Sequence, residues 1–309
     1  MVWGTTYIVA TELLPTGRPL LAAVARALPV GLAFVLWSRQ LPVGVWWWRS
    51  ALLGFLNIGA FFALLFLAAF RLPGGVAATA GAIQPLLAAA FATAIIGERF
   101  KRRTAIAGVM GIAGVALLVL QPGAEIDELG IGAALAGATS MALGIVLTKR
   151  WGRPVDLVTF TGWQLTAGGL MLLPIALLVE GLPDALTAAN LGGFVWLSAV
   201  GTGLAYVNWF RGVQALPVAV SSFLGLLSPL VATIAGWVVL SESLTTMQLI
   251  GALLVLAAVI SPQLNMSRVR LRRSPARTHH RSVLPTNQLP TVPQSVDLAT
   301  TDFAPNGRA

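Results

Sequence analysis

Long apolar runs, separated by short connections, make up most of this sequence. We place the runs at residues 2–14, 19–37, 47–70, 73–97, 103–120, 129–149, 156–180, 190–210, 216–240 and 245–264. Proline and glycine mark the connections, for example at Pro15 with Gly17 and at Pro122 with Gly123. A run of about 20 apolar residues forms a helix of about 30 Å, which matches the hydrocarbon core of a bilayer. The pattern therefore predicts an all-α polytopic membrane protein with ten transmembrane helices.

Basic residues are divided unevenly between the two sides of the predicted bundle. The side reached after even-numbered runs holds Arg39, Arg49, Arg99, Lys101, Arg102, Arg103, Lys149, Arg150 and Arg153, and the other side is assigned only Arg18, Arg71 and Arg211. Because Lys and Arg accumulate in cytoplasmic loops, the first side is predicted to be cytoplasmic. The tail after the tenth run falls on the same side and is itself rich in arginine. We expect a multi-pass cell-membrane protein with a cytoplasmic C-terminal tail.

The chain matches itself when it is shifted by 144 positions. At this offset the matched pairs include Phe66 with Phe210, Pro73 with Pro217, Gly81 with Gly225, Pro85 with Pro229, and Glu98 with Glu242. Aligned prolines, glycines and a glutamate at one offset indicate duplication of a five-helix unit. Because five is odd, the two copies insert with opposite orientations. The sequence thus predicts two inverted repeats, at residues 1–120 and 129–264, a plan common in secondary transporters whose substrate site lies between the halves.

Composition supports the membrane class and argues against several others. The chain is 57% hydrophobic and 10% charged, which is more apolar surface than a soluble core of this size could bury. It has no cysteine, and both histidines lie in the tail, so the spans hold no thiolate or histidine chemistry. We predict no enzyme activity, no metal site and no cofactor. The net charge of +9 follows from membrane topology, so we expect lipid and a small-molecule substrate as partners, and no nucleic acid.

Residues 265–309 have the composition of a disordered segment, with much Arg, Pro, Thr and Ser and few apolar residues. We interpret them as a solvated, basic cytoplasmic tail. Binding of this tail to anionic lipid is the alternative.

Three motifs resemble a known family. They are WGTTYIV at residues 3–9, IIGERF at 95–100 and SPLVATIAGWVVLSESL at 228–244. Together with the duplicated ten-helix plan, they resemble the EamA-type carriers of the drug/metabolite transporter superfamily over residues 1 to about 264. The resemblance implies a secondary transporter of small metabolites or drugs in the cytoplasmic membrane, an exporter that works by alternating access. Family members usually have more residues before the Trp-Gly pair, so we expect either a short first helix or a start upstream of Met1.

Two other functions without ionisable chemistry fit the spans, a passive membrane channel and a membrane-bound sensor. The duplicated kinked helices favour a carrier over both.

Two prolines lie inside predicted helices, at equivalent positions of the repeats. Pro85 and Pro229 cannot donate to the helix ladder and disturb the carbonyls of Gly81 and Gly225, so each helix is expected to kink there. Polar Gln84 and Ser228 precede the two prolines. A kink beside a polar side chain is tolerated in lipid where it faces protein or a wet cavity, so these residues either line the substrate pathway or serve helix packing.

Two charged residues inside the predicted spans are candidates for the substrate pathway. Arg26 lies well inside the second run, where an arginine costs about 2.5 to 3.5 kcal/mol to insert; it therefore pairs, lines a path or snorkels to the interface. The resembling family has an arginine in the corresponding span. Glu12 pairs with Arg26, carries a coupling proton, or lies at the outer surface beside Pro15, which is the reading we favour.

Other candidates for the substrate pathway are uncharged. They are Trp3, Tyr7, Asn57, Gln164, Tyr206 and Asn208. Small hydrogen-bonding groups near indole rings suit a small amphiphile, but hydrogen bonds between helices explain each amide equally well.

The remaining motifs are interpreted structurally. The tryptophans at 46–48 are expected at the membrane interface, and Glu98 and Glu242 are expected to cap helices. One helix face is expected to pack closely through Gly132, Ala136, Ser140 and Gly144.

Overall fold

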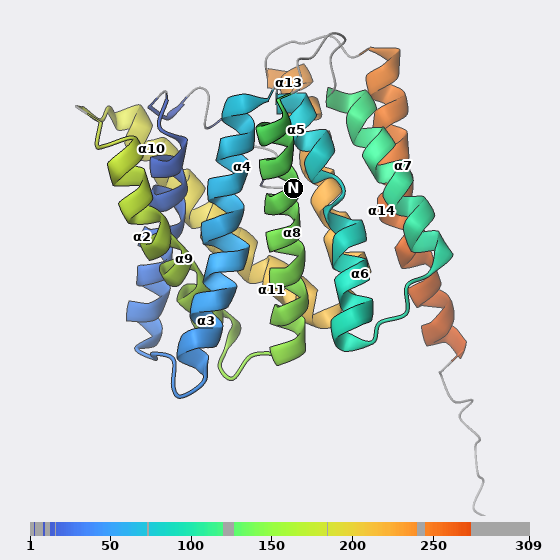
Figure 1. The fold of residues 1–309 in the computed structure, drawn as a ribbon, viewed down its shortest axis with the longest axis horizontal. Coiled ribbons are helices and arrows are strands. Elements are labelled where there is room, and N and C mark those ends of the chain that lie inside the picture. The colour runs from blue at the N-terminus through green and yellow to red at the C-terminus, as the bar shows by residue number, and fades with distance from the viewer. Residues whose placement is uncertain are drawn as a thin grey trace, which may run out of the picture.

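The computed structural model describes residues 3, 9, 13–15, 17–72, 74–119, 127–183, 185–239 and 245–272, and all regular structure within them is helical (Figure 1). Eight helices in this part are long and apolar enough to cross a membrane. They span Pro19–Ser38, Trp46–Ala69, Val76–Ile96, Arg102–Val119, Glu128–Trp151, Leu157–Val179, Ala188–Ala215 and Thr246–Gln263. A ninth apolar helix, Val218–Ile234, is shorter. The prediction of an all-helical membrane protein is confirmed, while the count of ten stays a prediction.

The described part of the first half forms two long uninterrupted helices with interrupted ones between them. The elements are α2 (Pro19–Ser38), α3 (Trp46–Gly54), the π-helix η1 (Phe55–Gly59), α4 (Ala60–Arg71), α5 (Gly74–Gly81), α6 (Gln84–Ile96) and α7 (Arg102–Val119). Pro19 starts α2 at a position where its missing N–H costs nothing, and Arg39 ends that helix in the left-handed conformation.

The described part of the second half forms three long uninterrupted helices and, between the second and third of them, interrupted ones. Its elements are α8 (Glu128–Trp151), α9 (Leu157–Val179), α10 (Ala188–Val195), the π-helix η2 (Trp196–Leu204), α11 (Ala205–Ala215), α12 (Val218–Phe223), the 3-10 turn η3 (Leu224–Leu226), α13 (Leu227–Val239) and α14 (Thr246–Arg272). Asp156 caps α9 by accepting hydrogen bonds from Thr159 and Val158, and the bond from the Thr159 hydroxyl holds the pKa of this carboxyl below its usual value. Helix α14 continues through the first residues of the expected tail.

Helices from the two halves pack side by side. Helix α2 lies along α9, α7 lies along α14, and α8 packs against both α4 and α6 near the middle of the bundle (Figure 1). Glycines allow α7 and α14 to touch through their backbones. A Cβ added to Gly114 would lie 2.9 Å from the carbonyl oxygen of Gly251, and a Cβ added to Gly251 would lie 2.7 Å from the carbonyl oxygen of Gly114. Such small residues are how helices approach closely in lipid.

The expected packing face of α8 is wrong in its first half. Gly132 and Ala136 are exposed, and nothing lies within 4 Å of a Cβ added to Gly132. Ser140 and Gly144 are buried, and the Ser140 hydroxyl donates to the Leu56 carbonyl at 2.9 Å. Each step of four residues rotates about 40° around an α-helix, so a series of such steps leaves any one contact face.

We call the lower end of the bundle in Figure 1, where α6, α8 and α11 end, the basic end. The assignment of Arg211 to the opposite side is wrong, because Arg211 follows the eighth run, which is even-numbered. The structure agrees with this parity, since α11 continues to Ala215 and its last turn lies beside basic residues of this end. Arg153 Nε donates to Gln214 Oε1 at 3.0 Å, and Lys149 donates to the Leu216 carbonyl. The correction increases the charge difference between the two ends.

Tryptophans gather at the same end. Trp47 and Trp48 are 57% and 51% exposed, as expected for an interfacial position. Arg49 lies over the rings of Trp46, Trp48 and Trp151 at 5.3 to 5.7 Å.

Candidate functional site

A buried arginine lies at the contact between the two halves. Arg26 projects from the alanine-rich α2 and is only 8% exposed. Its Nε donates to Thr202 Oγ1 at 3.0 Å and its Nη2 donates to the Gly201 carbonyl at 3.2 Å, both in η2. The guanidinium also lies 5.0 Å from the centre of the Phe62 ring. Arg26 does not snorkel, and it makes no ion pair within the described part of the chain.

The backbone of η2 supplies the anchor for this arginine. A π-helix shifts hydrogen bonding from i→i+4 to i→i+5, and such segments are frequent at functional sites. The Gly201 carbonyl accepts from the Trp3 indole at 3.0 Å as well as from Arg26. The other π-helix, η1 at 55–59, falls on 199–203 when shifted by 144, so both halves carry this irregular segment at equivalent positions.

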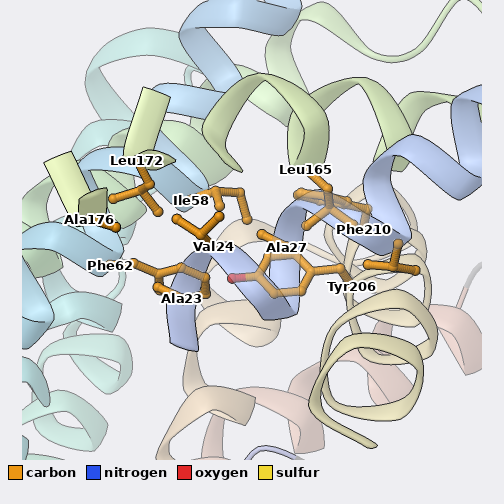
Figure 2. Close-up of a cluster of buried hydrophobic side chains, with 11 residues drawn as sticks. Ala23, Val24, Ala27, Ile58, Phe62, Leu165, Leu172, Ala176, Tyr206 and Phe210 are labelled. Atoms are coloured by element: carbon orange, nitrogen blue, oxygen red, sulfur yellow. The ribbon is translucent and has the colours of Figure 1, made fainter. Parts of the chain in front are cut away.

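Further aromatic rings pack around Trp3, which shares the Gly201 carbonyl with Arg26. The Trp3 ring lies 5.3 Å from that of Tyr206 and 5.1 Å from that of Trp209. Tyr206 is 2% exposed and packs with Phe210 against Val24 and Ala27 of α2 (Figure 2). The Trp209 indole N–H is buried and has no hydrogen-bond partner among the described residues. We call Trp3, Arg26, Phe62, Gly201, Thr202, Tyr206 and Trp209 the Arg26 cluster.

A cleft of about 570 Å³ opens at the end of the bundle opposite the basic end. It is lined by Arg18, Glu180, Phe66 and their neighbours. The Glu180 carboxylate accepts from the Leu20 and Leu21 amides at 2.7 and 2.8 Å, which fixes the start of α2. The Phe66 ring lies 6.4 Å from that of Phe62, so two phenylalanines, one helical turn apart, separate the cleft from Arg26.

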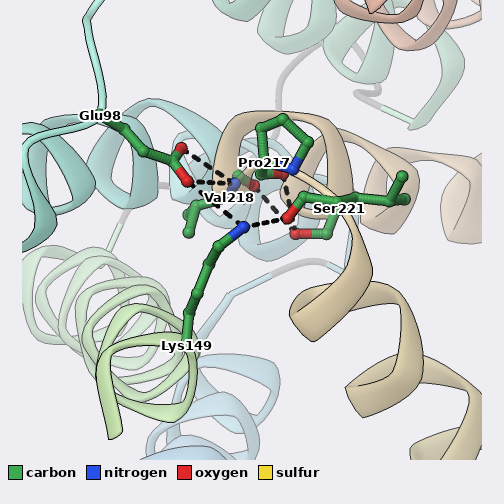
Figure 3. A network of polar contacts seen from close by, with 6 residues as sticks. Glu98, Lys149, Pro217, Val218 and Ser221 are labelled. Atoms are coloured by element: carbon green, nitrogen blue, oxygen red, sulfur yellow. Dashed lines mark hydrogen bonds and ion pairs between the residues drawn. The ribbon is translucent and has the colours of Figure 1, made fainter. Parts of the chain in front are cut away.

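At the basic end, a carboxylate links the two halves (Figure 3). Both Glu98 oxygens accept from the Val218 amide, at 3.3 and 3.1 Å, and Glu98 Oε1 lies 3.3 Å from Lys149 Nζ. Lys149 also donates to the Leu216 carbonyl. A negative charge at the start of α12 is favourable because of the helix dipole. Glu98 therefore caps a helix, but one in the other half and not its own.

Comparison with known proteins decides the family. The chain matches the EamA-like transporter family over residues 1–120 and 128–261. The chain belongs to this family. It is 46% identical over 264 residues to Protein PecM of Dickeya dadantii (strain 3937), covering 85% of this chain and 89% of that protein. It is 28% identical over 290 residues to the probable amino-acid metabolite efflux pump of Salmonella typhimurium (strain LT2), covering 89% and 94%. A solved structure with 20% identity and a TM-score of 0.72, covering 86% of this chain and 95% of its own, shares the fold.

Two amides of this EamA-family protein pair with each other across helices. Asn57 Nδ2 donates to Gln164 Oε1 at 2.9 Å and to Thr148 Oγ1 at 3.3 Å, and all three residues are fully buried. They join η1, α9 and α8. Of the two readings of Asn57 and Gln164, the structure places them in hydrogen bonds between helices.

The helices are interrupted near both prolines of this EamA-family protein. Helix α5 ends at Gly81 and α6 begins at Gln84, with Pro85 in its first turn. In the second half, η3 contains Gly225 and α13 begins one residue before Ser228, with Pro229 next. Gln84 Oε1 lies 3.8 Å from the position of a Cβ on Gly225, so the two interruptions face each other, and Gln84 Nε2 is buried without a partner in the described residues.

The remaining candidates do not join the Arg26 cluster. Asn208 is exposed, and its Nδ2 donates to the Leu204 carbonyl of its own helix at 2.8 Å. Tyr7, Glu12 and Glu242 lie outside the described residues. Sequence reasoning missed Phe62 and Thr202. The one available signal for Thr202 was the pair of glycines around it, of which Gly203 matches Gly59 at the repeat offset.

Proposed function

We propose that this EamA-family protein is a secondary transporter that exports small metabolites or drugs across the cell membrane by alternating access. The observation that carries the proposal is the burial of Arg26, from the first half, against η2, from the second half. Ionisable groups inside membrane spans usually mark a substrate or ion path. Transport follows from the family, and the outward direction is suggested by the relative named as an efflux pump.

The arrangement of helices supports an inverted repeat of ten helices. The packed pairs α2 with α9 and α7 with α14 are each formed by elements that correspond under the offset of 144. The π-helices and the interruptions near Pro85 and Pro229 also occupy equivalent positions. Irregular backbone inside a membrane is tolerated where it is buried in protein or lines a cavity. In a carrier of this plan, rocking of one half against the other exposes the shared site to each side in turn.

The two ends of the bundle suit one state of such a cycle. At the basic end, which is cytoplasmic by charge, Glu98 and Lys149 join α6, α8 and the start of α12. At the opposite end, the cleft reaches Phe66. This combination fits a carrier closed to the cytoplasm, with Phe62 and Phe66 between the cleft and Arg26.

The substrate pathway in this proposal comprises two groups of residues. Trp3, Arg26 and Tyr206 form the first, and Gln84 and Ser228, at the facing interruptions, form the second. Tyr7, as a pathway residue, and Glu12, as a carboxylate to be tested for proton coupling, stay predictions from the sequence. Asn57, Gln164 and Asn208 are left out, because their hydrogen bonds are made to the protein itself.

The test is transport by the purified full-length chain in proteoliposomes, screened with amino acids, nucleosides and cationic drugs. A carrier gives flux that saturates with substrate and exchanges against substrate on the other side. Flux that rises linearly and shows no exchange would indicate a passive channel instead. With a transported compound in hand, Gln84→Leu and Ser228→Ala should impair transport at normal membrane abundance.

Two variants refine this test. Asn57→Leu is the matched control for Gln84→Leu, because it removes a buried amide that bonds only to protein; transport per folded molecule should persist. Glu12→Gln should flatten the pH dependence of transport and leave exchange intact, if this carboxyl carries the coupling proton. Normal rate and affinity in both Gln84→Leu and Ser228→Ala would place the pathway elsewhere.

A further inference from the structure

The geometry points to a specific substrate chemistry: we infer that the Arg26 cluster binds the two-oxygen acid group, such as a carboxylate, of a small aromatic or otherwise flat amphiphile. The inference rests on the proposed function, because it names the substrate class of the same site.

The Arg26 guanidinium uses only some of its hydrogen-bond donors within the described residues. It has five N–H donors, arranged along two edges that can each hold a pair of acceptors. One edge, formed by Nε and Nη2, is already occupied by Thr202 Oγ1 and the Gly201 carbonyl. The other edge, formed by Nη1 and Nη2, makes no hydrogen bond to the described residues. This edge has the spacing that matches two oxygens of a carboxylate.

The positive charge of Arg26 has no counter-charge among the described residues. A buried cation is normally paired, because desolvation without a counter-charge is costly. Arg26 instead has neutral partners, a hydroxyl, a carbonyl and the Phe62 ring, and the ion pairs of the described residues lie elsewhere, at Arg71 and Lys149. The described residues hold the guanidinium in place but do not neutralise it. An anionic ligand would supply the missing charge.

The Trp209 indole and the neighbouring aromatic rings add a hydrogen-bond donor and apolar surface to the cluster. Trp209 Nε1 is buried with no acceptor in the described part of the chain, and its ring lies 5.1 Å from that of Trp3. A second unused donor beside Trp3, which shares the Gly201 carbonyl with Arg26, again indicates an acceptor-rich ligand. The rings of Trp3, Tyr206 and Trp209 offer flat apolar surfaces for the body of that ligand. Because the cluster is closely packed, entry requires Phe62 and Phe66 to move aside from the cleft.

The experiment compares acids with their near-isosteric neutral and cationic analogues. The purified full chain is heated with indole-3-acetate, indole-3-acetamide or tryptamine, and with phenylacetate, phenylacetamide or phenethylamine. The readout is the ligand concentration that gives half of the maximal rise in Tm. In at least one series we expect the acid to act at a concentration about tenfold or more below that of its amide. No preference for the acid in either series would overturn the inference.

Substitutions assign the preference to the cluster. Arg26→Gln should abolish it, and Arg26→Lys should weaken it, because an ammonium lacks the paired donors. Arg49→Gln is the matched control, since Arg49 also lies over aromatic rings, at the basic end; it should keep the preference. If Arg26→Gln fails to fold, Trp209→Phe serves instead. It removes an unpartnered N–H and should weaken acid binding several-fold with no loss of Tm in the free protein. An acid preference that survives both Arg26→Gln and Trp209→Phe would overturn the inference.

The outcome is separable from that of the proposed function. Saturable exchange of the amides or amines, with no preference for the acids, would keep the carrier and reject the acid-binding site. Acid-dependent stabilisation that depends on Arg26, without any exchange in proteoliposomes, would keep the site and reject the carrier.

Discussion

At the scale of single residues, buried polar groups of the membrane spans separate into two kinds by what they bond to. Asn57 Nδ2 donates to Gln164 and Thr148, which joins three elements, while Asn57 Oδ1 and Gln164 Nε2 are buried without a partner among the described residues. Within the described residues, Arg26 uses only part of its donors and makes no ion pair. The first kind holds helices together, and the second is the kind that we propose for ligand binding.

A substitution of Asn57 tests the structural kind. Asn57→Leu removes the donor to Gln164 and Thr148 and leaves the Gln164 amide buried without that partner. Hydrogen bonds between membrane helices contribute about 0.6 kcal/mol on average and up to about 1.7 kcal/mol, so a loss of about 1 kcal/mol is expected. The measurement is the free energy of unfolding in detergent or bicelles. Unchanged stability, with transport per folded molecule lost, would move Asn57 to the ligand-binding kind.

The sequence could identify these residues but not their partners. A polar side chain inside a long apolar run is visible from composition, and Arg26, Asn57, Gln164 and Tyr206 were all found in this way. The bond from Arg26 to Thr202 joins residues 176 positions apart. No local pattern encodes such a pairing, and Thr202 alone is an ordinary residue of a membrane helix. The hydrogen-bond partner of each buried polar residue is determined by tertiary packing.

At the scale of elements, the sequence predicted where helices break at prolines but not where they adopt π-helical geometry. Proline chemistry located the breaks between α5 and α6 and between α12 and α13, since a missing N–H acts locally. The π-helices η1 and η2 contain no proline, and nothing in the spacing of their apolar residues distinguishes them from α-helix. Their geometry depends on packing against neighbours such as α2 and α9.

The cap of α12 yields a prediction at this scale. Glu98 should contribute through its charge at the helix start and through its bonds to the Val218 amide and Lys149. Loss of a helix cap costs about 0.5 to 2 kcal/mol, so Glu98→Ala should lower the free energy of unfolding by about 1 kcal/mol. Glu98→Gln should cost less, because its amide oxygen still accepts a hydrogen bond.

Lys149→Met, alone and combined with Glu98→Ala, completes a double-mutant cycle for this contact. A coupling energy above zero is expected, because each single variant removes the same contact. Additive effects would mean that the ion pair contributes nothing, and that the cap acts through the Val218 amide alone.

At the scale of the whole molecule, the topology was predicted from two features of the sequence, the distribution of Lys and Arg and the match of the chain with itself at an offset of 144. The uneven distribution of Lys and Arg indicated which loops share a side, and the structure gathers Lys149 and Arg153 with the end of α11. Arg211 was misplaced by a parity error: it follows the eighth apolar run, so the predicted runs themselves assign it to the basic end, where α11 ends at Ala215. The packed pairs of helices required the structure, since an offset of 144 says which elements correspond but not that they touch.

The predicted topology can be tested directly, because the chain contains no cysteine. Single cysteines at Arg102 and Arg150, which lie at the starts and ends of helices on the basic end, should resist an impermeant thiol reagent in intact cells. Single cysteines at Gly17 and Glu128, which are exposed at the opposite end, should react. Permeabilised cells provide the control, because all four positions should then be labelled.

A cysteine at Thr245, between α13 and α14, tests the ten-helix parity separately, since it should react from outside only if ten helices precede a cytoplasmic tail. Labelling of position 102 in intact cells would reverse the orientation of the whole bundle and place the cleft beside Arg18 on the cytoplasmic side.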